Sequence, residues 1–168
     1  MKIVRYRTQD AVSYGVLRGN SIEPILGEPW PSIVPSGAAS VPLNQVKLLA
    51  PVRPGKILAV GFNYRDHARE FNKPIPTVPN IFMKPDTSLT SPDAPVILPP
   101  LYTRQVEHEA ELVVVIGKKA RFVPEEEALD YVLGYTCGND VTARDMQSPT
   151  NQWSVCKGFD TFAPIGPW

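Results

Sequence analysis

Two glutamates, Glu109 and Glu111, precede an apolar stretch, residues 112–116, whose composition is typical of a β-strand. In a strand both carboxylates would face the same side, about 6–7 Å apart along the backbone. Carboxylates held this close repel each other unless a cation or protons lie between them. Such an oxygen-rich site suits Mg²⁺, Mn²⁺ or Ca²⁺ better than zinc. Glu107 shares the face, and the alternative interpretation is that all three glutamates line the solvated face of an edge strand.

A histidine and a glutamate could supply acid–base chemistry. His67 and Glu70 are three residues apart in a predicted helix over residues 63–71, so they would share one face. A neighbouring carboxylate fixes the tautomer of an imidazole and raises its basicity, as a general base for water requires. A surface pair or a structural histidine is the alternative. The other histidine, His108, would point away from Glu109 and is interpreted as structural.

Four separated segments, taken in order, resemble the fumarylacetoacetate hydrolase family, especially its bacterial and acylpyruvase-like branch. They are residues 60–70, 107–117, 134–147 and 157–168, and the resemblance covers roughly residues 48 to 168. It implies an α+β fold, a β-rich roll of mixed sheets. It also implies that the chain ends before later strands that close the family's substrate site.

The resemblance assigns roles residue by residue. It implies that Glu109, Glu111 and Asp140 bind Mg²⁺, with Mn²⁺ or Ca²⁺ as alternatives, which agrees with the preference of these ions for oxygen ligands. It makes His67 and Glu70 the catalytic pair. It also places Lys157 near the metal, where an ammonium would stabilise an enolate or oxyanion.

Three further positions complete the predicted site. Gln147 would hydrogen-bond the substrate, Lys84 would bind a substrate carboxylate, and Thr161 would support Lys157 from behind. Asp145 competes with Asp140 as third metal ligand. Because Asp145 follows Arg144, the expectation is that the two form a structural salt bridge.

The implied function is metal-dependent hydrolysis of a C–C bond in a 2-oxo or β-diketo acid, such as an acylpyruvate, through a metal-bound enolate. The same enolate chemistry would serve a decarboxylase or isomerase of 2-hydroxy-dienoates or oxaloacetate. An alternative of another class is a catalytically silent partner subunit or fragment.

The surrounding elements divide the chain in two. Residues 1–45 are expected to form a small β lobe, with strands at 2–7, 11–18 and 21–24 and a proline-rich linker over 28–42. Residues 46–168 would be the catalytic part, with strands at 46–51, 56–60, 81–85 and 107–117. Further helices are expected at 124–133, where Pro124 precedes three glutamates, and at 140–147.

Composition excludes several function classes. Lys and Arg total 17, as do Asp and Glu, and this balance predicts no nucleic-acid or anionic-membrane partner. Two cysteines and no apolar leader are typical of a reduced, cytoplasmic protein. The resemblance leads us to expect incomplete burial of Val113 and Val115 and a homodimer or larger assembly, possibly completed by another chain.

Overall fold

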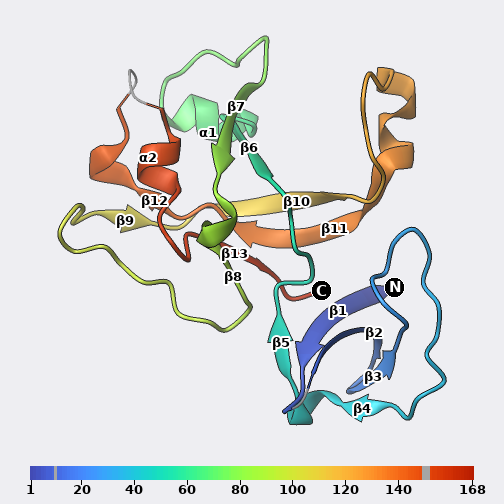
Figure 1. Cartoon of the computed structure of the whole chain (residues 1–168). Helices are drawn as coiled ribbons and strands as arrows, with labels where there is room; N and C mark the ends of the chain where they lie inside the picture. The colour runs from blue at the N-terminus through green and yellow to red at the C-terminus, as the bar shows by residue number, and fades with distance from the viewer. Residues whose placement is uncertain (10, 149–151) are drawn as a thin grey trace.

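The computed structural model describes residues 1–9, 11–148 and 152–168 and consists mainly of short strands (Figure 1). Its first part is a five-stranded antiparallel sheet in the order β4-β3-β2-β1-β5. The strands are β1 (Lys2–Arg7), β2 (Val12–Arg18), β3 (Ser21–Pro24), β4 (Val41–Pro42) and β5 (Lys47–Leu49), with a 3₁₀ turn, η1 (Leu43–Gln45), before β5.

Strand alternation gives this sheet two apolar faces. Val4 and Tyr6 pack with Ile22 on one side, while Tyr14 and Val16 pack on the other. The three predicted strands are present, the second beginning at Val12. β5, expected in the catalytic part, pairs with β1 instead, so the first sheet extends to Leu49.

The second part holds three sheets. A four-stranded sheet has the order β10-β11-β13-β8, and two-stranded sheets pair β12 with β9 and β6 with β7. The strands are β6 (Ile57–Gly61), β7 (Asn80–Lys84), β8 (Leu89–Thr90), β9 (Val106–Glu107), β10 (Ala110–Ile116), β11 (Val132–Asn139), β12 (Thr142–Ala143) and β13 (Ala163–Gly166). The helices are α1 (Arg65–Glu70), α2 (Ser154–Lys157) and the 3₁₀ segments η2 (Asp86–Ser88), η3 (Glu125–Tyr131) and η4 (Arg144–Met146).

The two parts meet beside the C-terminus. In Figure 1 the C-terminal end lies close to the first sheet, and the Lys2 ammonium lies 3.9 Å from the centre of the Trp168 ring. The backbone N–H of Ala50 also donates to Ser91 Oγ, at 3.3 Å. A cation over an indole face is a favourable contact, which links the strand that opens the first sheet to the end of the chain.

Several predicted elements differ in the structure. The strand expected over 107–117 is two strands, because β9 pairs with β12 and β10 pairs with β11, with His108 and Glu109 between them. The helix expected over 140–147 is β12 followed by η4, since Thr142 pairs with Glu107. The first helix begins at Arg65, and its N-cap, Tyr64, makes no side-chain cap bond.

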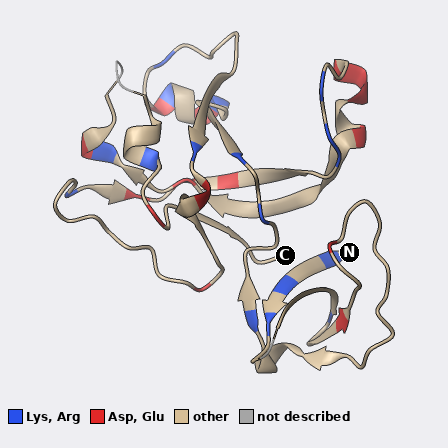
Figure 2. Cartoon of the chain, in the orientation of Figure 1, with Lys and Arg blue, Asp and Glu red and all other residues tan. Residues whose placement is uncertain are grey.

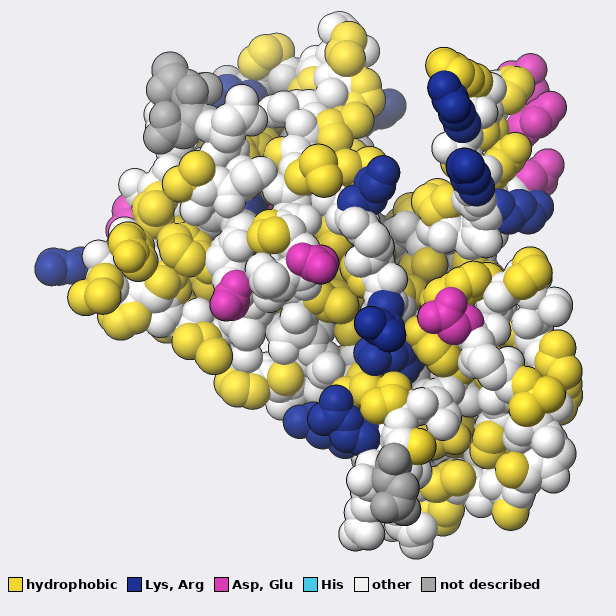
Figure 3. All heavy atoms as spheres, in the orientation of Figure 1, with side chains coloured by type: hydrophobic (Ala, Val, Ile, Leu, Met, Phe, Trp, Pro, Cys, Tyr) yellow, Lys and Arg dark blue, Asp and Glu magenta, His cyan; other side chains and the backbone are white. Residues whose placement is uncertain are grey.

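The helix expected over 124–133 is η3, a 3₁₀ segment at the tip of the β10–β11 hairpin, and it contains no buried residue. Figure 2 shows acidic residues at this end of the hairpin. Figure 3 shows basic side chains on one side of this tip and acidic ones on the other. Without an apolar partner, the segment lacks the packing that usually stabilises a short α-helix.

The core of the second part lies under the end of β11. Val141, Ala143, Cys156 and Phe162 form a buried cluster. On β10, by contrast, Val113 and Val115 are half-buried, as expected, while three alternating residues are exposed: Leu112, Val114 and Ile116. No helix within the described residues is long and apolar enough to cross a membrane.

Candidate active site

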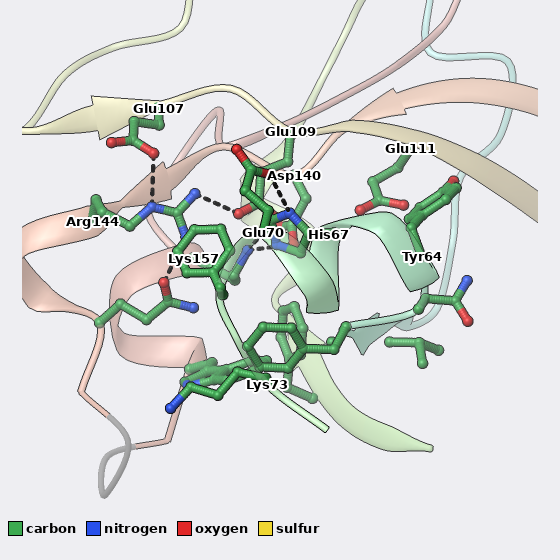
Figure 4. Close-up of a pocket in the computed structure, with 18 of the residues that line it drawn as sticks. Tyr64, His67, Glu70, Lys73, Glu107, Glu109, Glu111, Asp140, Arg144 and Lys157 are labelled. Carbon is green, nitrogen blue, oxygen red and sulfur yellow. Dashed lines mark hydrogen bonds and ion pairs between the residues drawn. The ribbon is translucent and has the colours of Figure 1, made fainter. Parts of the chain in front are cut away.

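A cavity of about 870 Å³ lies between α1, the start of β10 and α2 (Figure 4). One wall is acidic and basic, and its residues are Glu107, Glu109, Glu111, Asp140, Arg144, Gln147 and Lys157. The other wall is largely aromatic and carries the histidine, and its residues are Phe62, Tyr64, His67, Glu70, Phe71, Lys73, Phe82 and Trp153.

Lys157 is the centre of the polar wall. Its ammonium is 2.8 Å from Glu109 Oε2 and 2.7 Å from Asp140 Oδ2, and it also donates to the hydroxyl of Thr142 at 2.7 Å. The side chain is almost fully buried at the end of α2. A buried ammonium with three oxygen partners is a well-satisfied charge, held in one orientation.

Asp140 follows the end of β11 and is buried. Its second oxygen accepts a hydrogen bond from Lys84, the last residue of β7. Burial lowers the pKa of Lys84, and the charge and hydrogen bond of Asp140 oppose this effect. Lys84 is not among the described residues that line the cavity; it contacts Asp140, which is, and its assignment to a substrate carboxylate stays a prediction.

Glu109 is held by two cations. Besides Lys157, Arg144 binds it through Nη2, 2.6 Å from Oε1, and reaches Glu107 through Nε at 2.8 Å. Burial raises the pKa of Glu109, but the bonds to Lys157 and Arg144 outweigh burial and lower the pKa overall. The third Arg144 bond goes to the side-chain oxygen of Gln147, at 2.6 Å. Arg144 therefore fixes three side chains of the polar wall.

Glu111 has a different environment. Burial raises its pKa and the charges of Asp140 and Glu109 raise it further, while a hydrogen bond from Tyr64 and the charge of Lys157 only partly oppose them. It forms no ion pair within the described part of the chain. The surroundings of Glu111 thus oppose its ionisation, and a cation bound beside it would relieve that effect.

The predicted contact between His67 and Glu70 is present on α1. His67 Nδ1 lies 3.7 Å from Glu70 Oε2, and the imidazole is packed against two rings, Phe62 at 5.8 Å and Phe71 at 4.8 Å between centroids. Phe62 has a φ of +52°, a conformation that bulky residues rarely adopt. A strained backbone therefore directs this ring against the histidine.

Trp153 completes the aromatic wall. Its ring packs against Phe62 at 5.8 Å and Phe82 at 5.6 Å. It also lies directly on Gly61, where a Cβ atom would come within 2.1 Å of the indole. Glycine at this position is what allows the ring to approach the backbone of β6.

The chemical type of these side chains suits a divalent cation, but their present arrangement does not. Three carboxylates, Glu109, Glu111 and Asp140, line one cavity, and hard oxygen ligands suit Mg²⁺, Mn²⁺ or Ca²⁺. Across the described residues, however, no group of three or more His, Cys, Asp or Glu side chains is positioned to hold a metal. The ammonium of Lys157 lies between two of the three instead. Binding a metal would require these contacts to rearrange.

Most of the predicted site residues line the cavity in the structure, and the others are not among its described lining residues. His67, Glu70, Glu109, Glu111, Asp140, Gln147 and Lys157 all line the cavity, as does His108.

Two predictions about supporting residues are wrong. Thr161 accepts a hydrogen bond from the backbone of Ile97 and, within the described residues, does not line the cavity. Thr142 contacts Lys157 instead. Arg144 is bound to Glu107 and Glu109, whereas Asp145 is hydrogen-bonded to Thr103 and to the backbone N–H of Arg104. Neighbours in sequence point to different sides here, so adjacency was a poor guide to pairing.

Sequence reasoning did not identify the aromatic wall or the full role of Arg144. The sequence did contain a signal for the aromatic wall, since Phe62 follows Gly61 and Phe71 follows Glu70 at the end of the predicted helix. The pairing of Trp153 with Gly61 joins segments far apart in the chain, so no local pattern reveals it.

Comparison with known proteins identifies relatives for both parts. The family model described as "Fumarylacetoacetate (FAA) hydrolase C-terminal" matches residues 56–168, and the one described as "Rv2993c-like, N-terminal" matches residues 1–51. The bovine protein "Oxaloacetate tautomerase FAHD2A, mitochondrial" is 41% identical over 170 residues, covering 91% of this chain and 54% of the relative.

Solved structures share the fold. "5-carboxymethyl-2-hydroxymuconate delta-isomerase from Mycobacterium smegmatis" has a TM-score of 0.90 and 40% identity, covering all of this chain and 66% of that one. Maleylpyruvate hydrolase from Sphingobium, in complex with manganese and pyruvate, has a TM-score of 0.74 and 30% identity, with 100% and 66% coverage. The chain spans between 42% and 65% of the length of three curated relatives that it matches. On these matches, the chain belongs to the fumarylacetoacetate hydrolase family.

Proposed function

We propose that the full protein is an isomerase or tautomerase that moves a proton between the enol and keto forms of a 2-oxo acid. One observation carries this proposal: the His67–Glu70 pair and the Lys157 cluster line the same cavity. A group that can take a proton therefore shares one space with a fixed ammonium.

His67 would act as the proton carrier. Its imidazole would remove a proton from the carbon next to the substrate's carbonyl and then return it to another position, the oxygen in tautomerisation or a distant carbon in isomerisation. Glu70, beside Nδ1, would orient the ring and stabilise the imidazolium formed between the two transfers. The net reaction leaves the carbon skeleton intact.

The polar wall would stabilise the charge that develops. A fixed positive charge near an enolate oxygen lowers the barrier most when it needs no reorganisation. Lys157 is held by three contacts that use its three N–H groups, so it would act through its charge. If the contacts of Lys157 rearranged, Glu109, Glu111 and Asp140 would hold a divalent cation, which would supply Lewis-acid polarisation of the 2-oxo carbonyl. Gln147, fixed by Arg144, would hydrogen-bond the substrate.

C–C bond hydrolysis is the second candidate, since the same histidine could take a proton from water instead of from carbon. The likeness to maleylpyruvate hydrolase supports it, while the likenesses to the oxaloacetate tautomerase and the muconate isomerase support the first candidate.

Product analysis by NMR distinguishes the two candidates. The full-length protein with Mg²⁺ is given enol-oxaloacetate and, separately, acetylpyruvate. Tautomerisation of the first, with an intact skeleton in both, is the expected result. Release of pyruvate and acetate from acetylpyruvate faster than tautomerisation would favour the hydrolase instead. No conversion of either compound would support the silent-partner alternative.

A further inference from the structure

A second cavity lies against the first sheet. It has a volume of about 590 Å³, which is within the range of small-molecule sites. Its described lining residues come from β1, from β2, from the segment after β3 and from the connection between β5 and β6. None of them lines the candidate active site. The proposed proton transfer therefore makes no use of this cavity.

Two arginines give the second cavity an excess of positive charge. Arg5 on β1 and Arg53, between β5 and β6, both line it, together with a single acid, Glu28. None of these three side chains makes an ion pair within the described part of the chain. Two guanidinium groups against one carboxylate leave a net positive charge that is available to an anion.

The hydroxyl of Tyr14 is a buried donor that lacks a partner. Tyr14 lies directly opposite Arg5 in the antiparallel pairing of β1 and β2, so both side chains lie on one face of the sheet. The residue is only 6% exposed, and its hydroxyl has no hydrogen-bond partner among the described residues. Buried hydroxyl groups are nearly always hydrogen-bonded, because an unsatisfied one costs free energy. A ligand that accepts this hydrogen bond would remove that cost.

The Tyr14 ring is held beside the charged residues of the cavity. The ring of Trp30 packs edge-on against it, with 5.8 Å between the centroids. Burial raises the pKa of Tyr14, and the charge of Glu28 raises it further, whereas the charges of Arg5 and Arg53 lower it. The hydroxyl thus lies within electrostatic reach of all three charged side chains. Because its pKa is raised overall, it stays a protonated donor at neutral pH.

We propose that the second cavity binds a phosphate group, with Arg5 and Arg53 as charge partners and the Tyr14 hydroxyl as a hydrogen-bond donor. A guanidinium group can bind two phosphate oxygens at once. Three donor groups from separate segments suit the several oxygens of a phosphate better than the two of a carboxylate. Glu28 can only accept hydrogen bonds when ionised, so it suits hydroxyl groups of an attached organic part. Inorganic phosphate and phosphate monoesters share this chemistry, and the test separates them.

The test measures phosphate binding to the full-length protein. Calorimetry in EDTA, which removes metal ions that bind phosphate, compares inorganic phosphate, glycerol 3-phosphate and acetate. Both phosphate compounds should bind more tightly than acetate. Tighter binding of glycerol 3-phosphate than of inorganic phosphate would identify a monoester as the ligand, and equal or weaker binding would identify free phosphate.

Substitutions locate the binding to this cavity. Arg5→Met should weaken phosphate binding by about 10- to 100-fold, the usual effect of losing a hydrogen bond to a charged group. Arg53→Met should weaken it less, because Arg53 is exposed. Arg7→Met is the matched control and should leave the affinity unchanged. Arg7 is an exposed arginine of the same strand and is not among the described residues that line the cavity.

Tyr14→Phe separates ligand binding from a structural role of the hydroxyl. Without phosphate, the variant should melt at the wild-type temperature or above it, since an unpartnered polar group has been removed. With phosphate, it should be stabilised less than the wild-type protein. A lower melting temperature without phosphate, together with wild-type phosphate affinity, would show that the hydroxyl is structural.

Three results would overturn the proposal. The first is that neither phosphate compound binds at millimolar concentration. The second is that Arg5→Met and Arg53→Met both bind phosphate as the wild-type protein does; the exposed Arg53 keeps this comparison available if Arg5→Met fails to fold. The third is that acetate binds as tightly as phosphate, which would assign the cavity to a carboxylate instead.

Discussion

Lys157 and Asp140, both buried, are joined by a hydrogen bond of 2.7 Å between the ammonium and one carboxylate oxygen. The same ammonium holds Glu109 from the other side. Two of the three carboxylates that the family resemblance assigns to a metal are therefore neutralised by the protein itself. The stability of this cluster should depend on which cation is present.

Lys157→Met tests this dependence. Removing one member of a buried ionic cluster leaves the others uncompensated and typically costs about 3–5 kcal/mol. We expect a lower melting temperature in EDTA and a larger rise on adding Mn²⁺ than the wild-type protein shows, because the metal would replace the missing charge. An equal response of both proteins to Mn²⁺ would argue against a shared cation position.

Glu111→Gln should have the opposite effect on stability. The pKa of Glu111 is raised by burial and by the charges of Asp140 and Glu109. The folded protein thus binds this proton more tightly than the unfolded chain, and the ionised form costs stability at any pH above the raised pKa. In EDTA at pH 7 the variant should therefore be more stable than the wild-type protein.

This advantage should shrink as the pH falls through the raised pKa of Glu111 toward 4.5, the ordinary value. Denaturant unfolding of the variant and the wild-type protein between pH 4 and 8 measures this difference in the free energy of unfolding. A difference in stability that stays constant with pH would contradict the assignment. The variant should also lose most of the stabilisation by Mn²⁺, since one oxygen ligand is replaced by a neutral amide.

Gly61→Ala tests the aromatic wall. The new methyl group would meet the Trp153 ring at 2.1 Å, so the ring must move. Overpacking of this kind costs about 1–3 kcal/mol, and we expect turnover to fall as well because Phe62 and His67 share the displaced contacts. Gly55→Ala is the matched control, since nothing lies within 4 Å of its added Cβ. Equal effects of the two substitutions on melting and turnover would exclude a special role for the Trp153 contact.

Local patterns in the sequence predicted the strands of the first sheet and the pairing of His67 with Glu70. Side chains alternate along a strand, and residues three apart share one face of a helix, so both patterns relate near neighbours. The expectation that Glu109, Glu111 and Asp140 converge came instead from the family resemblance. No local rule joins β10 to the residue after β11.

Long-range contacts explain the rest. Lys84 was expected against the substrate, but it is separated by 56 residues from its partner Asp140 and lies buried beneath it. The helix expected over 140–147 gave way to strand pairing between Thr142 and Glu107. In the second case tertiary pairing outweighed local propensity, and in both cases only the folded structure reveals the contact.

Self-association remains a prediction of the sequence. β10 exposes three large apolar side chains, Leu112, Val114 and Ile116, and alternation places them on one face. Apolar faces of this kind are frequent at protein interfaces. We expect light scattering on the full-length protein to give the mass of a dimer or larger assembly, and Val114→Glu to lower that mass. A monomeric wild-type protein at micromolar concentration would rule out the expected assembly.

The most direct test of the proposed proton transfer is exchange of substrate hydrogen with solvent. In D₂O with Mg²⁺, the full-length protein should incorporate deuterium at the carbon next to the carbonyl of a 2-oxo acid. Proton NMR measures this incorporation. His67→Ala should slow this exchange by about 10²- to 10⁴-fold, the usual contribution of a general base, and leave Mn²⁺ binding nearly unchanged. Exchange that proceeds at the wild-type rate in His67→Ala, or that the wild-type protein does not catalyse at all, would contradict the account.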